Sequence, residues 1–152
     1  MTRCQVRTFA NWVNGSTPLG LAVACVGRCT LRPTERGLYV ASGYVYGFPT
    51  SAAFTIGSVI LTRHSSDWLA QRPRLRAHEE RHAGQYALCG GLPLPPLYLA
   101  SMAYSKWRTG DRAAANVFER RAGLSDGGYK PRPPIRTLFG RRLRQPEVKT
   151  AT

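Results

Sequence analysis

The stretch LRAHEERHAGQYALCGG, residues 75–91, decides the fold because it contains an H-E-x-x-H motif in a segment without helix breakers. A proline precedes the stretch and a pair of glycines closes it, so the sequence predicts a helix over 73–89. At about 100° per residue, His78 and His82 fall on one narrow stripe of that helix. Two imidazoles one turn apart can reach a common metal ion, so both histidines are candidate zinc ligands.

Glu79 lies about 100° around the predicted helix from His78, beside the metal rather than on it. From there its carboxylate can take a proton from a zinc-activated water and later return the proton to a leaving amine. We therefore assign Glu79 the role of general base and acid. Gln85 and Cys89 share the histidine stripe, but Cys89 lies about 10 Å beyond His82 along the helix and is excluded as a ligand.

The alternative interpretation of this helix is an ordinary charged surface helix. In that case Arg76 and Glu80 form an i,i+4 ion pair exposed to solvent. The wheel places both of these residues opposite the histidines, whereas the histidine side faces the apolar segments of the chain. We therefore favour metal binding and expect Arg76 and Glu80 to occupy a solvated face.

A catalytic zinc ion needs three protein ligands, so two histidines leave the site incomplete. His64 follows a predicted strand and is expected in a surface turn, and Asp111 is expected to cap a helix. Glu119 lies in AAANVFERRAG, residues 113–123, where small side chains on both sides would allow close approach of a second helix. Glu119 is the favoured third ligand, and a surface glutamate beside two arginines is the alternative.

The remaining segments predict an α+β fold. Residues 16–27 read as a helix capped by Ser16 or Thr17, and the β-branched segments 37–45 and 52–62 read as two strands, forming an antiparallel pair. One capped turn is expected over 65–72, and further helices are expected over 97–108 and 112–122.

The charge of the chain is strongly positive, with 22 Lys and Arg against 8 Asp and Glu and a formal net charge of +14. Such a chain is attracted to anionic partners. Residues 129–152 are basic and rich in proline, so we expect a flexible tail that follows a single domain over 1–128 and offers an anionic partner a binding site. Nucleic-acid binding is less favoured, because no recognition-helix motif is visible.

The four cysteines form no C-x-x-C pair, and the N-terminus shows no secretory signal pattern. We therefore expect buried free thiols in a cytoplasmic protein. The longest apolar runs fall short of the ~20 residues that a spanning helix needs. The apolar stretch 92–107 leaves peripheral contact with a membrane open.

Three segments together resemble a known family. HEERH with a downstream helical Glu119 resembles the zincin metallopeptidases, in particular the gluzincins. AAFTIGSVILTR followed by LRAHEERHAGQY resembles small bacterial metallopeptidase-like domains in which a β-hairpin leads into an AHE-x-x-H-x-x-Q helix. GLPLPPLY followed by NVFERRAGL resembles the C-terminal part of small bacterial zincin-like proteins. The resemblance covers residues 50–128 and implies His78, His82 and Glu119 as zinc ligands, with Glu79 as base and acid.

The resemblance implies a minimal zincin-like domain that hydrolyses peptide bonds with zinc. It also implies that strand 52–62 is an edge along which an extended peptide substrate pairs. Tyr98, Tyr104, Tyr129 and several arginines are all candidates to stabilise the oxyanion. The alternative function is a non-catalytic metal-binding module that contacts a protein or a membrane surface.

Overall fold

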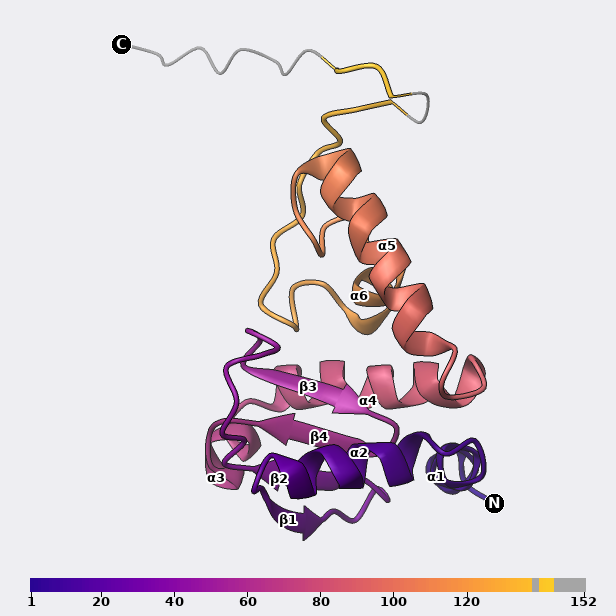
Figure 1. The fold of residues 1–152 in the computed structure, drawn as a ribbon, viewed down its shortest axis with the longest axis vertical. Coiled ribbons are helices and arrows are strands. Elements are labelled where there is room, and N and C mark those ends of the chain that lie inside the picture. Colours follow the sequence, from indigo (N-terminus) through magenta and orange to yellow (C-terminus); the bar gives the residue numbers. More distant parts are fainter. Residues whose placement is uncertain (138–139, 144–152) are drawn as a thin grey trace.

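The computed structural model describes residues 1–137 and 140–143, which form six helices and one four-stranded sheet (Figure 1). The helices are α1 (Arg3–Val13), α2 (Ser16–Val26), α3 (Ser66–Ala70), α4 (Pro73–Leu88), α5 (Leu94–Thr109) and α6 (Val117–Ala122). The strands are β1 (Thr30–Pro33), β2 (Tyr39–Ser42), β3 (Ala53–Ile56) and β4 (Val59–Thr62). The predicted α+β class is confirmed.

The sheet has the strand order β1-β2-β4-β3 and combines both pairing directions. β1 and β4 are antiparallel to β2 and β3 respectively, whereas β2 and β4 are parallel. The predicted antiparallel pair of 37–45 with 52–62 is wrong, because the second segment is itself the hairpin β3–β4. Gly57 turns that hairpin at a φ of 60°, and a side chain there would overlap the backbone of Ser16.

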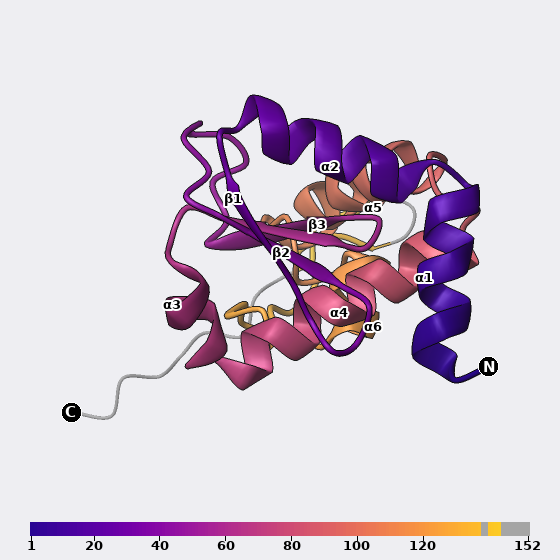
Figure 2. The same cartoon turned by 90° about the horizontal axis from the view of Figure 1, so that it is seen from below.

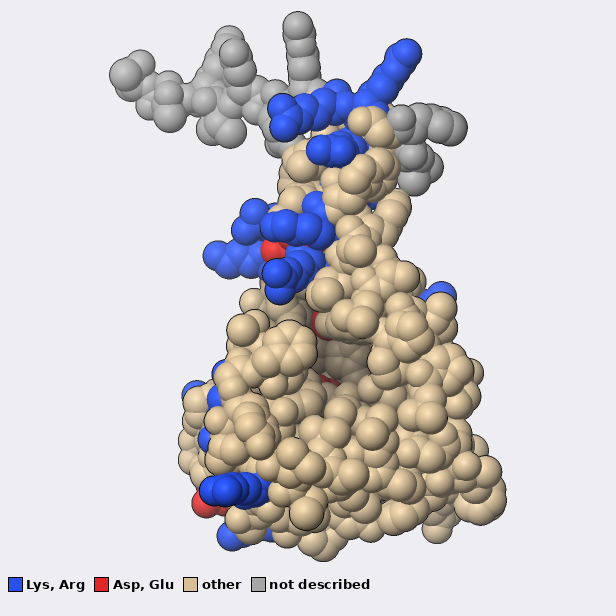
Figure 3. All heavy atoms as spheres, in the orientation of Figure 1, with Lys and Arg blue, Asp and Glu red and all other residues tan. Residues whose placement is uncertain are grey.

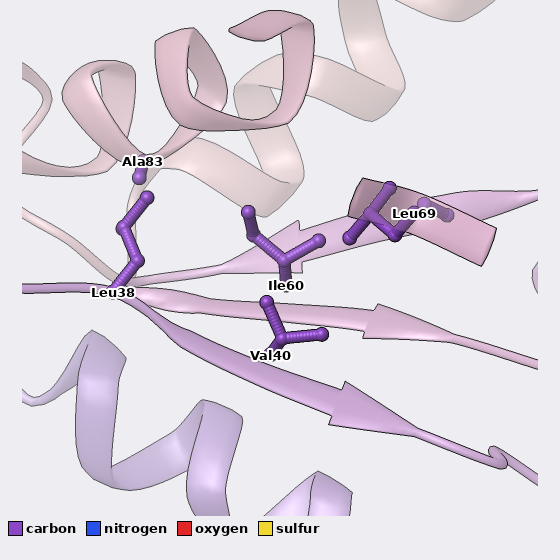
Figure 4. Packing of buried hydrophobic residues seen from close by; sticks show 6 residues of the cluster. Leu38, Val40, Ile60, Leu69 and Ala83 are labelled. Carbon is purple, nitrogen blue, oxygen red and sulfur yellow. The ribbon is translucent and has the colours of Figure 1, made fainter. Parts of the chain in front are cut away.

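Helices cover both faces of the sheet. α2 lies on one face and α3 and α4 lie on the other, as Figure 2 shows. On the α4 side, buried apolar side chains join the sheet to the helices, and Figure 4 shows them: Leu38, Val40, Ile60, Leu69 and Ala83. On the α2 side, a second cluster contains Ala24, Ala41, Val59 and Leu61. These two apolar layers hold α4 against β3, which positions the candidate site.

α1 is a helix that the sequence prediction does not contain. It packs against α4, where Arg7 forms an ion pair of 2.7 Å with Glu80 and Asn11 Nδ2 donates to the Ala83 carbonyl at 2.9 Å. Arg36 also contacts Glu80, at 3.1 Å. The prediction that Glu80 lies on a solvated face is therefore wrong, because α1 covers this face of α4, and the alternative ion pair of Glu80 with Arg76 is replaced by pairs with Arg7 and Arg36.

The predicted helix over 16–27 is confirmed as α2, but its predicted cap is wrong. Gly15 occupies the N-cap position in the left-handed conformation, and Ser16 and Thr17 lie buried inside the helix. The Thr17 hydroxyl accepts a hydrogen bond of 3.1 Å from the Ser58 backbone N–H. The Thr17 hydroxyl therefore attaches α2 to the β3–β4 hairpin, and the Ser16 hydroxyl donates to Asn14 Oδ1 at 2.7 Å, so neither caps the helix.

The capped turn over 65–72 is confirmed as α3, which begins after Ser65. His64 is exposed and stacks on Trp68 with ring centroids 3.9 Å apart, as expected for a surface turn. α5 extends the predicted helix 97–108 at both ends. Only the last part of 112–122 is helical, because Asp111 caps a short turn and Asn116 separately caps α6.

All four cysteines are free thiols. The expectation that they are buried is wrong, since Cys25 is exposed and the other three are partly buried. The expected basic tail, 129–152, lies partly outside the described residues. In its described part, the Ile135 N–H donates to the Arg108 carbonyl at 2.8 Å, which attaches this segment to the end of α5. Among the described helices, none has the length and apolarity needed to cross a membrane.

Candidate metal centre

Three side chains from two helices converge in the interior. His78 and His82 come from the buried face of α4, and Glu119 comes from α6. The two Nε2 atoms are 3.1 Å apart. The Glu119 carboxylate reaches both, with its Oε2 atom 3.2 Å from His78 Nε2 and its Oε1 atom 3.6 Å from His82 Nε2. The structure thus brings together the three residues that were predicted to bind zinc.

The spacing of these atoms suits a tetrahedral metal ion. Zinc binds histidine nitrogen and carboxylate oxygen at about 2.0–2.1 Å, so neighbouring ligand atoms of a tetrahedral site lie about 3.3 Å apart. The distance of 3.1 Å between the two Nε2 atoms and that of 3.2 Å from His78 Nε2 to Glu119 Oε2 are close to this value, and the other carboxylate oxygen lies 3.6 Å from His82 Nε2. Within the described residues, these three form a group whose ligand atoms all lie within 4.8 Å of one another, and neither His64 nor Cys89 belongs to it.

Hydrogen bonds to the outer ring nitrogens fix the orientation of both imidazoles. His78 Nδ1 lies 3.1 Å from the Ala122 carbonyl and 3.0 Å from the Gly123 carbonyl, so it donates to the end of α6. His82 Nδ1 lies 2.9 Å from Gln85 Oε1. In each neutral imidazole, Nδ1 carries the proton and Nε2 presents a lone pair to the other ligands.

Gln85 supports the assignment of the proton to Nδ1 of His82. Its Nε2 atom donates to the Phe118 carbonyl at 2.8 Å, which leaves its oxygen to accept from His82. Because Phe118 precedes Glu119 on α6, Gln85 orients His82 and also attaches α4 to the helix that carries the third candidate ligand. Such outer partners typically raise the affinity of a metal site 10–100-fold.

The donor set fits a divalent cation. Two imidazole rings and a carboxylate face one another, and Glu119 Oε2 is buried without a hydrogen-bond donor among the described residues. Burial raises the pKa of Glu119, but hydrogen bonds that the rings of His78 and His82 donate lower that pKa by more, so the carboxyl is ionised well below neutral pH. Where neither Nε2 atom carries a proton, the three acceptors repel one another unless a cation lies between them. Nitrogen and oxygen ligands of this kind are those that zinc takes in catalytic sites.

Glu79 lies beside this group rather than within it. Its carboxylate is 3% exposed, and Thr55 on β3 donates a hydrogen bond of 2.7 Å to its Oε2 atom. Burial raises the pKa of Glu79 above its ordinary value, more than the nearby histidines and Thr55 lower it. A carboxylate with a raised pKa is a stronger base, which suits the predicted role in proton transfer.

Two tyrosines complete the polar surroundings of the site. The Tyr98 hydroxyl on α5 donates to Glu119 Oε1, and the Tyr129 ring centroid lies 6.3 Å from that of His78. Burial raises the pKa of Tyr98 and also raises that of Tyr129, to about 12, so both hydroxyls stay protonated donors. Tyr104, the third candidate, lies instead on the exposed side of α5.

These groups line a cavity of about 270 Å³. β3 forms one wall, α4 forms the floor, and the start of α5 forms the opposite wall with Leu94, Pro95 and Leu99. The lining is mainly apolar, and its titratable side chains are those of the site: His78, Glu79, His82, Tyr86, Tyr98, Glu119 and Tyr129. Figure 3 shows a hollow on this face with acidic atoms at its base. No arginine lines the cavity in the part of the chain that the structure describes.

Sequence reasoning singled out the three side chains that converge here but missed Thr55 and Gly127. A Cβ on Gly127 would lie 2.6 Å from His78 Cε1, so a glycine is needed where this segment crosses the imidazole. Neither residue belongs to a motif, and both reach the site only through tertiary packing. Tyr98 stood among several equivalent tyrosines in the sequence, and only its contact with Glu119 distinguishes it.

Comparisons with known proteins add no assignment to this geometry. No protein-family model, curated protein or solved structure matches the chain.

Proposed function

We propose that this protein is a zinc-dependent metallopeptidase of the gluzincin type, with His78, His82 and Glu119 as zinc ligands. The observation that carries the proposal is the convergence of these three side chains beside a buried glutamate that has a raised pKa. A zinc ion bound by His78, His82 and Glu119 would supply Lewis-acid chemistry, which polarises a carbonyl and activates water.

In this proposal Glu79 is the general base and acid. It takes a proton from the water that attacks the scissile carbonyl carbon and returns that proton to the leaving amine. The bond between the carbonyl carbon and the amide nitrogen breaks, and a carboxylate and an amine result. Thr55 holds the Glu79 carboxylate in position, and Tyr98 and Tyr129 offer protonated hydroxyls toward the oxyanion.

The substrate site of the proposal is formed by β3 and the apolar cavity. β3 is the edge strand of the sheet and pairs only with β4 among the described strands. Its free edge borders the cavity, so an extended peptide can add to the sheet as a further strand. The mainly apolar lining then favours a substrate with an apolar side chain next to the cleaved bond.

The test combines metal analysis with a peptide-library digest. Protein purified without chelators is expected to contain about one zinc per chain and to cleave peptides from the library. Glu79→Gln is expected to keep the zinc and to lose turnover by at least about 10²-fold, because the amide cannot take the proton. Glu35→Gln, at an exposed glutamate that does not line the cavity, serves as the matched control and should keep both the zinc and the turnover.

Two results would oppose the proposal. Absence of bound zinc in the purified protein removes the metal centre. Zinc binding without any cleavage in the wild-type protein favours the alternative, a non-catalytic metal-binding module, in which Glu79→Gln would have no effect on function.

A further inference from the structure

α5 directs its hydrogen-bonding side chains toward the protein. Ser101 and Ser105 accept hydrogen bonds from the backbone N–H groups of Val117 and Ala115, at 2.9 and 2.8 Å. Tyr98 on the same side donates to Glu119. Hydrogen bonds therefore attach the inward side of α5 to α6 and to the segment before it.

The outward side of α5 is apolar. At about 100° per residue, its exposed side chains fall on one continuous half of the helix. The large ones are Leu97, Leu99, Tyr104 and Trp107, which are 50%, 54%, 40% and 36% exposed. Alanines and a proline fill the positions between them: Pro96, Ala100 and Ala103. A continuous exposed apolar strip of this kind marks a contact site rather than an ordinary surface.

Basic side chains gather at the C-terminal end of this strip. Lys106 and Arg108 lie in the last turn of α5, one on each margin of the apolar half. The described part of the next segment adds Arg136, Arg141 and Arg142. The Arg136 guanidinium lies 5.9 Å from the Trp107 ring, and Arg136 forms a β-bridge with Arg142. Figure 3 shows basic side chains around this end of the molecule.

We propose that the outward side of α5, together with this basic cluster, binds an anionic lipid membrane. Aromatic and leucine side chains beside lysine and arginine are the composition of helices that lie in a membrane interface. The basic cluster then pairs with acidic headgroups, each charge strengthening the attraction. A second copy of the chain fits this surface poorly, because two molecules of net charge +14 repel each other.

Docking through α5 would place the candidate site next to the membrane. Leu94, Tyr98 and Leu99 of α5 also line the cavity, so the helix that touches the lipid also forms a wall of the substrate site. If the proposed peptidase activity holds, its substrate is a membrane-proximal segment of another protein. This consequence rests on the proposed function, whereas lipid binding itself does not.

Vesicle flotation tests the proposal with the full-length protein. The protein is expected to float with vesicles of 7:3 phosphatidylcholine and phosphatidylglycerol, to remain unbound with phosphatidylcholine alone, and to dissociate as salt is added. Leu97→Gln combined with Trp107→Gln is expected to weaken binding at least about tenfold. Arg141→Gln combined with Arg142→Gln is expected to weaken it about fivefold for each charge removed.

A matched control comes from α1, which exposes apolar side chains of similar size. Val6→Gln combined with Phe9→Gln, at positions 52% and 63% exposed, is expected to leave vesicle binding unchanged. Circular dichroism and zinc content verify that each variant is folded. These readouts also separate a failure of lipid binding from a failure of the proposed metal site.

Fluorescence locates the contact. In a protein with Trp12→Phe and Trp68→Phe, the remaining Trp107 is expected to be quenched by brominated anionic vesicles. Binding that is equally strong without anionic lipid, or that is lost in the α1 control instead of the α5 variant, overturns the proposal. So does concentration-dependent dimerisation that Leu97→Gln abolishes while anionic vesicles fail to bind.

Discussion

Glu119→Gln separates the role of Glu119 as a metal ligand from its role in packing. The side chain keeps its shape, and its amide oxygen can still accept from Tyr98. Its amide nitrogen replaces Oε2, which is buried without a donor and lies 3.2 Å from His78 Nε2. In the metal-free variant the new N–H therefore donates to the lone pair of His78 Nε2, which the wild-type carboxylate repels.

The two effects of this change have opposite signs. Relief of an unsatisfied buried acceptor stabilises the metal-free protein by about 1–3 kcal/mol. For a chain of this size, 1 kcal/mol raises Tm by about 2–4 °C, so the expected rise is about 2–12 °C. Zinc at a thousandfold excess over its Kd stabilises the wild-type protein by about 4 kcal/mol, or about 8–16 °C, whereas the variant should gain almost none of this.

Differential scanning calorimetry at pH 8, where free histidine is neutral, measures both effects with and without zinc. The expected pattern is a higher Tm for Glu119→Gln in chelator and a higher Tm for the wild type in zinc. An equal rise with zinc in both proteins would show that Glu119 is not a ligand. A lower Tm of the variant in chelator would refute the inference that the three acceptors repel one another.

Two further predictions concern the residues around the ligands. Gln85→Ala removes the acceptor that orients His82 and is expected to weaken zinc binding about 10–100-fold in a chelator competition, with little change in secondary structure. Gly127→Ala places a Cβ 2.6 Å from His78 Cε1 and is expected to displace the ring and reduce zinc affinity, which the same competition measures. Gly84→Ala on α4 is the matched control, because open space surrounds its Cβ position. It should keep zinc affinity and raise the free energy of unfolding by about 1 kcal/mol.

The sequence alone determined the features that depend on local periodicity. The spacing of His78 and His82, the lateral position of Glu79 and the place of Gln85 on the histidine stripe all follow from 3.6 residues per turn. The limits of α4 follow from the proline before it and the glycines after it. The hairpin β3–β4 was also locally encoded, since Gly57-Ser58 is a two-residue hairpin turn between two β-branched segments, although residues 52–62 were predicted as one strand.

Tertiary structure decided the features that depend on partners distant in the chain. The pairing of Glu80 with Arg7, the parallel pairing of β2 with β4 and the approach of Thr55 to Glu79 have no local signal. Each results from long-range packing, whose energy depends on surfaces that come together only in the folded chain. The third candidate ligand, Glu119, depends on both the local sequence and the tertiary structure. The residues around Glu119 marked it as a candidate, but only the docking of α6 on α4 places its carboxylate within 3.6 Å of both imidazoles.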